Sequence, residues 1–426
     1  MKKSEIAQNS KTFCILPWIH QYVGPPGDIK PCCMYDQNSQ IGDLKTSTLK
    51  EIWNNDQTRQ LRRDMLDGKT IPECHKCNTR ENLTITHRAQ FNSFKFKGEN
   101  IAVVDSTLDD GTVPEHRLKY IDVRFNNLCN FRCRTCGPRF STGWIEDHVR
   151  MYKLTLEERV FHGDIFQYPG QTEEQLLEEI MPHLPYVQEI YFAGGEPLMQ
   201  REHYAVLEEL IRLGRTGNDL SINYNTNFSI LKLGSKNVLD LWKQFKFIRI
   251  SASLDGSGAR AEFWRKGTVW DTVLKNRQAL KEQCPNVKFS INYTLSWVNS
   301  TNLVEMHREW IEQGLVHMDD INVNLLDTPP YYSLKAIPMF KKKKIEELFL
   351  EHTIWLESQG ASERTINGFK NAITFMYDSE PSDEFVLAKE FLKVNDALDD
   401  IRNEDFWGIF SEHNDLKEFL DQGGTK

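Results

Sequence analysis

The sequence lacks any long hydrophobic run. No apolar stretch approaches the roughly 20 residues that are needed to span a bilayer, and the opening residues MKKSE are not followed by the apolar core of a signal peptide. An excess of basic charge is also missing, because 61 Asp and Glu residues outnumber 52 Lys and Arg residues and the formal net charge is −9. We therefore expect a cytoplasmic protein with no membrane partner, and the charge argues against a nucleic acid as the main partner.

The sequence also lacks internal repeats, low-complexity tracts and a plausible disulfide framework. Its nine cysteines are odd in number and bunched at close spacing, which does not suit a set of disulfide bonds. In a reducing compartment such clusters usually hold metal. Cys284 stands alone before Pro285 and is expected to be a bystander thiol. The other cysteines predict metal or iron–sulfur sites.

Four segments follow from composition. With 426 residues, the chain is too long for one typical compact domain, so we expect two or three domains. Residues 1–100 hold five of the cysteines and are predicted to form a cysteine-rich module. A polar segment rich in turn formers marks a linker at 101–117. Residues 118–335 are predicted to form a strand–helix domain, and the acidic residues 336–426 a helical C-terminal region.

The strand–helix domain shows the clearest rhythm. Short apolar or alternating runs recur between stretches that are long enough for helices, which is typical of repeated strand–helix units and a parallel sheet. Six strands are expected, at 120–125, 189–193, 221–224, 247–254, 288–295 and 321–326. Helical spacing of apolar residues is found at 173–184, 204–213, 273–282 and 303–313. The predicted fold is therefore α/β, with a partial (β/α)6 barrel.

Three closely spaced cysteines directly follow the first expected strand. Cys129, Cys133 and Cys136 lie in the run NNLCNFRCRTCGP, separated by three and then two residues. A tetrahedral zinc ion or an ordinary electron-transfer cluster takes four protein ligands. Three ligands therefore leave one iron of a cluster open to another group. A structural zinc loop that borrows a distant fourth ligand is the alternative.

This loop resembles the signature loop of the radical S-adenosylmethionine (SAM) superfamily. The resemblance implies that Cys129, Cys133 and Cys136 bind a catalytic [4Fe–4S] cluster, whose open iron is chelated by the amino and carboxylate groups of SAM. An electron donor such as flavodoxin or ferredoxin would reduce this cluster. SAM is then cleaved to a 5′-deoxyadenosyl radical, which abstracts a hydrogen atom from the substrate.

Later strand ends are similar to other motifs of the same family. The run AGGEP at 193–197 resembles the Gly-Gly-Glu-Pro motif that meets the methionine amino group of the cofactor, and NTN at 225–227 is similar to a Thr-Asn-Gly segment, with Phe228 in place of the glycine. The run SASLDG at 251–256 resembles a segment in which a serine and a downstream arginine hold the cofactor's carboxylate or ribose. The resemblance assigns cofactor contacts to Gly194, Gly195, Glu196, Asn227, Ser253 and Arg265. Taken alone, the Gly-Gly-Glu-Pro run would more often be a simple tight turn, and any one of these motifs could arise by chance.

Position strengthens these assignments. Every polar cluster falls at the carboxyl end of an expected strand, which is where barrels of alternating strands and helices place their active sites. Asp327 follows the last expected strand and is a weak candidate for a catalytic acid, base or substrate ligand on the same ground.

The N-terminal cysteines predict a second site. Cys14, Cys32, Cys74 and Cys77 can close a zinc site or a four-iron cluster, and spacing alone does not choose between them. The Gly-x4-Cys at 27–32 and the closing Cys-x2-Cys resemble twitch and SPASM modules, which hold auxiliary [4Fe–4S] clusters and usually follow the barrel. The resemblance implies one auxiliary cluster on these four cysteines. Cys33 is the alternative to Cys32, and zinc is the alternative metal.

Together these motifs predict a radical SAM enzyme, but they do not name its substrate. Modification of a peptide or protein side chain is our first hypothesis. Oxidation or epimerisation of a sugar or aminocyclitol is the second, since cofactors supply the radical chemistry and folds do not dictate substrates. A non-catalytic iron–sulfur scaffold protein is a third hypothesis, of a different class.

Overall fold

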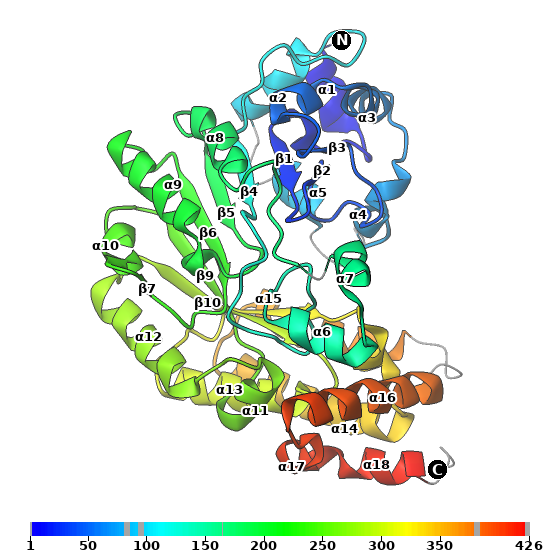
Figure 1. Ribbon diagram of the computed structural model, residues 1–426. Helices are drawn as coiled ribbons and strands as arrows, with labels where there is room; N and C mark the ends of the chain where they lie inside the picture. Colours follow the sequence, from blue (N-terminus) through cyan, green and yellow to red (C-terminus); the bar gives the residue numbers. More distant parts are fainter. Residues whose placement is uncertain (1, 81–85, 93–97, 164, 379–383, 422–426) are drawn as a thin grey trace. The chain divides into compact units, whose positions relative to one another are not determined.

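The computed structural model describes residues 2–80, 86–92, 98–163, 165–378 and 384–421 (Figure 1). The chain forms two compact units. The first comprises Met1–Asn127, Gln167–Asn223 and Gln244–Phe247, and the second comprises Leu128–Phe166, Tyr224–Lys243 and Ile248–Lys426. The boundaries of these units differ from the domain boundaries that we expected from composition. Those expected boundaries remain predictions.

The strands and helices of the first unit come from two separate parts of the sequence, 1–127 and 167–223. Its strands are β1 (His20–Val23), β2 (Asp28–Lys30), β3 (Gly42–Asp43), β4 (Tyr120–Val123) and β5 (Glu189–Phe192). Its α-helices are α1 (Lys3–Asn9), α2 (Leu49–Trp53), α3 (Asp56–Leu66), α4 (His75–Arg80), α5 (His87–Gln90), α8 (Gln175–Ile180) and α9 (Arg201–Arg212). The boundary between the units falls inside β6 (Ser221–Thr226).

The second unit contains the remaining strands and most of the long helices. Its strands are β7 (Lys232–Leu233), β8 (Lys236–Asn237), β9 (Ile248–Ser253), β10 (Lys288–Leu295) and β11 (Ile321–Leu325). Its α-helices are α6 (Trp144–Tyr152), α7 (Leu156–His162), α10 (Val238–Trp242), α11 (Gly258–Trp264), α12 (Trp270–Gln283), α13 (Ser300–Glu312), α14 (Met339–Ser358), α15 (Glu363–Tyr377), α16 (Glu384–Arg402), α17 (Phe406–Ile409) and α18 (Asn414–Asp421).

All six expected strands are present, as β4, β5, β6, β9, β10 and β11. In the first unit β4 pairs parallel with β5, and in the second unit β9, β10 and β11 pair parallel in that order. Helices occupy each connection, as expected because parallel strands need a crossover. The predicted α/β class with a parallel sheet and a helical C-terminal region is confirmed.

Strand β1 was not expected from the sequence. It pairs parallel with β4, with His20 opposite Tyr120 and Tyr22 opposite Asp122. On its other side it forms an antiparallel hairpin with β2. The cysteine-rich N-terminal segment therefore extends the sheet of the first unit.

Alternation along the strands explains their two faces. In β10 the side chains of Phe289, Ile291, Tyr293 and Leu295 are buried, whereas those between them are half-buried and polar. Successive side chains of a strand point to opposite faces of the sheet. One face of β10 is therefore apolar, and the other carries hydroxyl and carboxamide groups.

The C-terminal helices, orange to red in Figure 1, share an aromatic core with the rest of the second unit. Ring centroids of Trp297 and Phe391 lie 4.8 Å apart, and Phe406 lies 5.2 Å from both Phe391 and Phe410. All four side chains are buried. Burial of aromatic side chains dominates core energetics, so the C-terminal region is an integral part of this unit.

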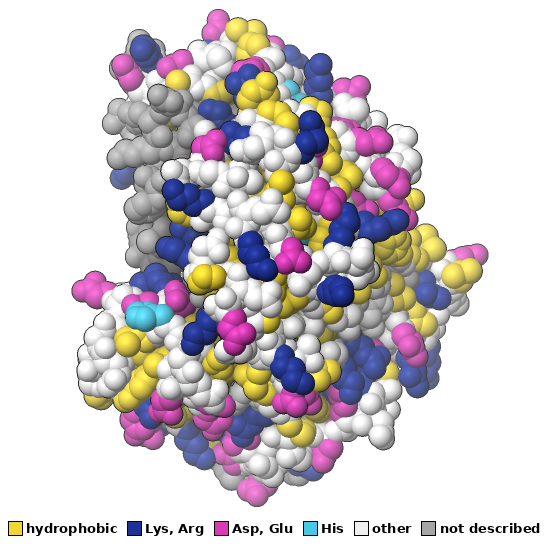
Figure 2. Space-filling view, turned by 90° about the vertical axis from the view of Figure 1, so that its left-hand side faces the viewer, with side chains coloured by type: hydrophobic (Ala, Val, Ile, Leu, Met, Phe, Trp, Pro, Cys, Tyr) yellow, Lys and Arg dark blue, Asp and Glu magenta, His cyan; other side chains and the backbone are white. Residues whose placement is uncertain are grey.

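Basic and acidic side chains are interspersed among the described residues on the face drawn in Figure 2. None of the helices in the described ranges is long and apolar enough to cross a membrane.

Candidate metal and cofactor sites

The loop 129–136 lies in the second unit and is held first by its backbone. The N–H groups of Arg132 and Arg134 donate to the carbonyl oxygens of Lys266 and Trp264, each at 2.9 Å. The loop therefore runs beside the residues that follow α11. This pairing places Arg265 next to the middle of the cysteine loop.

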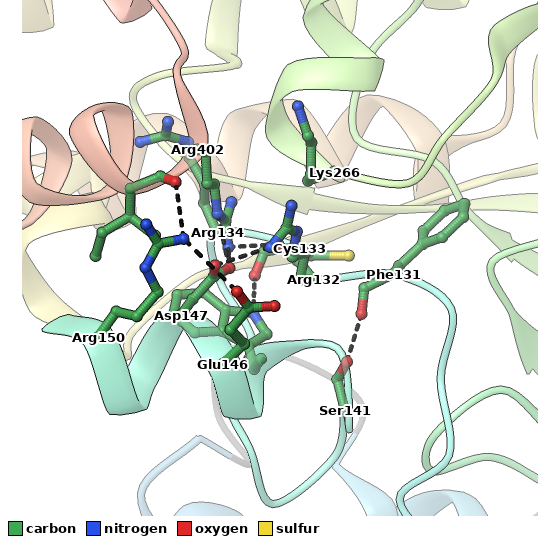
Figure 3. Close-up of polar contacts among 12 residues, drawn as sticks. Phe131, Arg132, Cys133, Arg134, Ser141, Glu146, Asp147, Arg150, Lys266 and Arg402 are labelled. Atoms are coloured by element: carbon green, nitrogen blue, oxygen red, sulfur yellow. Dashed lines mark hydrogen bonds and ion pairs between the residues drawn. The ribbon is translucent and has the colours of Figure 1, made fainter. Parts of the chain in front are cut away.

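Side chains fix the loop further. The indole Nε1 of Trp144 donates to the carbonyl oxygen of Cys133 at 2.6 Å, and the N–H of Cys136 donates to the same oxygen at 3.0 Å. The hydroxyl of Ser141 donates to the carbonyl oxygen of Phe131 (Figure 3). The loop is thus shaped by contacts with the start of α6.

Two of the predicted cofactor residues lie against the cysteine sulfurs. Nη1 of Arg265 donates to Sγ of Cys133 at 3.6 Å. Nδ2 of Asn227 lies 3.9 Å from Sγ of Cys129, within the longer range of hydrogen bonds to sulfur, and 2.9 Å from Oδ1 of Asn130. Hydrogen bonds to thiolate sulfurs tune the reduction potential of a cluster. Asn227 and Arg265 are therefore placed to act on a cluster held by this loop.

Asp255 holds Arg265 in place, a role that the sequence analysis missed. Its Oδ2 lies 2.7 Å from Nε of Arg265, and its Oδ1 accepts from the N–H of Thr294 at 2.7 Å. Burial raises the pKa of the Asp255 carboxyl, while Arg265 and the Thr294 N–H act in the opposite direction. The only available signal was its position, directly after the SASL run.

Burial also affects the cysteine thiols of this loop. It raises the pKa of Cys133, although the Arg265 guanidinium opposes the shift, and it raises the pKa of Cys136 to about 12. Metal binding requires thiolates and releases their protons. Because burial disfavours the thiolate forms, the positive charge of a bound metal group would stabilise them.

The remaining second-unit candidates stand at strand ends. Ser253 is half-buried and lies opposite Asn292 in the β9–β10 pair. Asp327 lies two residues after β11 and is exposed. No cofactor contact follows from these positions alone, so both roles stay predictions.

The Gly-Gly-Glu-Pro turn belongs to the first unit. Gly194 and Gly195 have φ angles of 71° and 40°, a region that favours glycine. A Cβ on Gly194 would lie 2.8 Å from Cβ of Arg124. Glu196 is buried, and its Oε1 accepts from the N–H of Leu198 at 3.1 Å. The local structure therefore explains the two glycines and gives Glu196 a capping role.

The four N-terminal cysteines face one cavity in the first unit. Cys14, Cys32, Cys74 and Cys77 line a space of about 20 Å³, together with apolar side chains and the side chains of Thr12, His87 and Arg88. Cys32 follows β2, Cys74 ends a 3₁₀ turn, and Cys77 lies in α4. Burial raises the pKa of both Cys14 and Cys74 to about 12. A soft, sulfur-rich donor set of this kind suits iron–sulfur clusters or zinc.

Cys33 is not part of this cavity lining. Its Sγ lies 4.0 Å from Nδ1 of His87. Burial raises its pKa to about 12, and the neighbouring carboxylate of Asp122 adds to the shift. Cys32 therefore lines the cavity, whereas Cys33 lies beside it, near the lining residue His87.

In the described ranges, no group of three or more His, Cys, Asp or Glu side chains meets the geometry for a single metal ion.

Two family models match the chain. Residues 123–296 match the model described as radical SAM superfamily, and residues 14–78 match the model described as an iron–sulfur cluster-binding domain, SPASM. The fold and the cysteine loops thus define a radical SAM domain preceded by a cluster-binding domain. Residues 123–296 thus belong to the radical SAM superfamily, and the SPASM domain at residues 14–78 precedes them. The cofactors predicted from the sequence are confirmed at the family level: a [4Fe–4S] cluster with SAM, and an auxiliary iron–sulfur cluster.

One curated relative is a 7,8-dihydro-6-hydroxymethylpterin dimethyltransferase from Methanocaldococcus jannaschii, which is 25% identical over 210 residues. The match covers 47% of this chain and 35% of the relative. The chain therefore spans about a third of the length of that protein.

Similar solved structures include anSMEcpe with bound AdoMet and Cp18Cys peptide, at 15% identity and a TM-score of 0.39, covering 57% of this chain and 61% of that one. Another is Streptococcus suis SuiB bound to the precursor peptide SuiA, at 14% identity and a TM-score of 0.38, covering 72% and 65%.

Proposed function

We propose that the chain is a radical SAM enzyme whose catalytic [4Fe–4S] cluster is held by Cys129, Cys133 and Cys136. When bound and reduced, this cluster would supply one electron to the sulfonium of SAM, which would split into methionine and a 5′-deoxyadenosyl radical, and this radical would take a hydrogen atom from the substrate. The observation that carries this proposal is the placement of Arg265 and Asn227 against the Cys133 and Cys129 sulfurs.

The chain's own residues hold and orient this site. Arg265 donates a charge-assisted hydrogen bond to the Cys133 sulfur, which favours its thiolate form, and Asp255 fixes the direction of that guanidinium. Gly194, Gly195, Glu196 and Ser253 are proposed to contact SAM on the strength of the family motifs that they match.

The second part of the proposal is an auxiliary [4Fe–4S] cluster on Cys14, Cys32, Cys74 and Cys77. These four side chains line one cavity, and Cys33 does not. Four protein ligands leave no iron open for a substrate. An electron-transfer or structural role therefore fits this cluster better than substrate binding, and flavodoxin or ferredoxin is the proposed electron donor of the enzyme in the cytoplasm.

A peptide or protein side chain is the substrate that we propose. Three carboxamides lie on the polar side of the second-unit strands: Asn292 Nδ2 lies 3.4 Å from Asn225 Oδ1, and Asn324 Nδ2 lies 2.8 Å from Asn292 Oδ1. Each carboxamide both donates and accepts hydrogen bonds, which complements peptide groups. Sugar hydroxyls have the same capacity, so a sugar or aminocyclitol is the second candidate.

The first test measures cluster content and SAM cleavage. The protein is purified without oxygen and reconstituted, and iron, sulfide and 5′-deoxyadenosine are measured after addition of dithionite and SAM. We expect about eight irons per chain for two four-iron clusters. Cys133→Ala is expected to lose about four irons and all cleavage. Cys284→Ala is the matched control, because its thiol is buried and donates to the Leu239 carbonyl oxygen.

The outcomes separate the parts of the proposal. About four irons with one zinc would remove the auxiliary cluster but keep the enzyme. An intact cluster that does not cleave SAM would favour the scaffold hypothesis.

The second test concerns the substrate. A peptide pool and a pool of sugars and aminocyclitols are added separately, and the rate of 5′-deoxyadenosine formation and mass changes in each pool are compared. Stimulation by the peptide pool, with a mass change in a peptide, is expected. Stimulation by the sugar pool alone would replace the first candidate with the second.

A further inference from the structure

Arg134, inside the cysteine loop, is held by the C-terminal end of the chain. Its side chain is completely buried and pairs through Nη2 with Asp399 and, at 2.7 Å, with Glu404. Its Nη1 donates to Oδ1 of Asn395 at 2.6 Å, and its guanidinium lies 4.1 Å from the ring centroid of Phe263. A buried charge destabilises the fold unless it is paired. These three polar partners all come from residues 395–404.

A second arginine reaches the loop in the opposite direction. Arg402, at the end of α16, donates through Nη2 to the carbonyl oxygen of Arg132 at 2.9 Å. It also pairs with Asp147 of α6 at 2.9 Å, and both side chains are fully buried. Asp147 in turn pairs with the Arg132 guanidinium at 2.8 Å. Figure 3 shows Arg132, Arg134, Asp147 and Arg402 converging around Cys133.

Glu404 joins this network to the segment that carries Arg265. One carboxylate oxygen pairs with Arg134, and the other lies 2.8 Å from Nζ of Lys266. Glu404 therefore links two segments of the chain, the cysteine loop that contains Cys133 and the 264–266 segment that contains Arg265. A shift of this carboxylate would change both sides of that contact.

We infer that residues 395–404 are a positioning element for the catalytic-cluster loop, which fixes Cys133 against Arg265 and so sets the reduction potential of the bound cluster. The part of this inference that concerns the reduction potential rests on the proposed function. Groups that orient a metal ligand tune the metal as well as hold it, and cluster potentials respond to nearby charge and hydrogen bonds. Asp399, Glu404 and Arg402 act through the loop and do not contact the cofactor.

The sign of the effect follows from charge. Reduction adds negative charge to the cluster, and the Glu404 carboxylate opposes it. Glu404→Gln removes that charge and leaves Arg134 and Lys266 less compensated. The potential of the catalytic cluster is therefore expected to shift to a more positive value.

The first measurement uses metal-free protein, so that it does not depend on activity. Hydrogen–deuterium exchange is followed at the amides of Arg132 and Arg134, which are bonded to the 264–266 segment. We expect exchange at least tenfold faster in the double variant Asp399→Asn/Glu404→Gln. Asp415→Asn is the matched control, since this C-terminal carboxylate pairs with Lys341 and Lys344. Equal acceleration in the control, or none in the double variant, overturns the inference.

The second measurement uses the reconstituted protein. Redox titration with electron paramagnetic resonance is expected to show a positive shift for one cluster in Glu404→Gln, no shift for the other, and recovery in Glu404→Asp. Thermal unfolding of each variant identifies a general loss of folding. Shifts in both clusters, or no recovery in Glu404→Asp, contradict the potential-setting role. If wild type fails to cleave SAM while exchange behaves as expected, the proposed function fails and the positioning element remains.

Discussion

Neighbouring residues with the same side chain have different surroundings in this protein. Cys32 lines the N-terminal cavity with three other cysteines, whereas Cys33 does not line it but lies near His87, which does, and near the Asp122 carboxylate. Because ligands of one cluster must converge on it, we predict that Cys32, and not Cys33, is the ligand.

We predict that Cys32→Ser lowers the iron content by up to about four atoms per chain, the content of one four-iron cluster, while Cys33→Ser leaves it unchanged. Iron and sulfide assays on the reconstituted variants check this expectation. The reverse pattern would assign the ligand to Cys33. Loss of iron in both variants would indicate that the local fold, and not ligation, controls cluster assembly.

At the scale of elements, a histidine pair joins α13 to α14. Nδ1 of His307 and Nε2 of His352 lie 3.0 Å apart, Nε2 of His307 donates to the Met318 carbonyl oxygen, and Nε of Arg308 donates to Nδ1 of His352. These contacts require both rings to be neutral, because an added proton would face another donor. Burial lowers the pKa of His307 to about 4 and that of His352 to about 3.

The pH dependence follows from these pKa values. Between about pH 6.5, the ordinary histidine pKa, and pH 4, the unfolded chain binds protons that the folded chain does not. The free energy of unfolding therefore falls as the pH is lowered through this window. Denaturant titrations at several pH values are expected to show a shallower fall for His352→Gln than for wild type. His317→Gln, at an exposed histidine, is the control that should leave the slope unchanged.

The burial of strands β1 and β4 in the first unit bears on why β1 was not expected from the sequence. Strand β1 has four residues, all buried, and pairs with β4, which is also buried throughout. A strand that is covered on both faces has no alternation to reveal it. Periodicity therefore found β10, whose faces differ, and missed β1, whereas β4 was expected as part of the longer run 120–125.

At the scale of the whole molecule, the C-terminal region contributes to the core of the second unit and also contacts residues that support the cysteine loop. Phe406 is fully buried and touches Phe391, Phe410 and Phe263, and Phe263 in turn stacks on Arg134. The helices that close the core thus also support the cysteine loop of the same unit.

We predict that Phe406→Ala lowers the free energy of unfolding by about 3–5 kcal/mol, the usual cost of emptying a buried phenylalanine site. Denaturant unfolding followed by circular dichroism measures it. Phe247→Ala is the control, because that ring is 43% exposed and its removal should cost far less. A loss below about 1 kcal/mol for Phe406→Ala would mean that the C-terminal helices are only loosely attached.

Much of the site could be predicted from the sequence because its signals are local. The spacing of Cys129, Cys133 and Cys136, the two glycines before Glu196 and the six strands all depend on residues close together in the chain. The roles of Asp255, Arg134 and Arg402 could not be predicted in this way. Nothing in the sequence distinguishes them from other charged residues, because their roles depend on the partners that they contact in the folded chain.

The sequence by itself determined the family, the α/β class and the thiolates available for the clusters, because covalent spacing sets which ligands one loop can present. Only the tertiary structure decided that Cys32 lines the N-terminal cavity and Cys33 does not, that β1 pairs with β4, and that residues 395–404 contact a loop more than 250 residues earlier in the chain. Such contacts are decided by packing and by the need to pair buried charges, which no local pattern encodes.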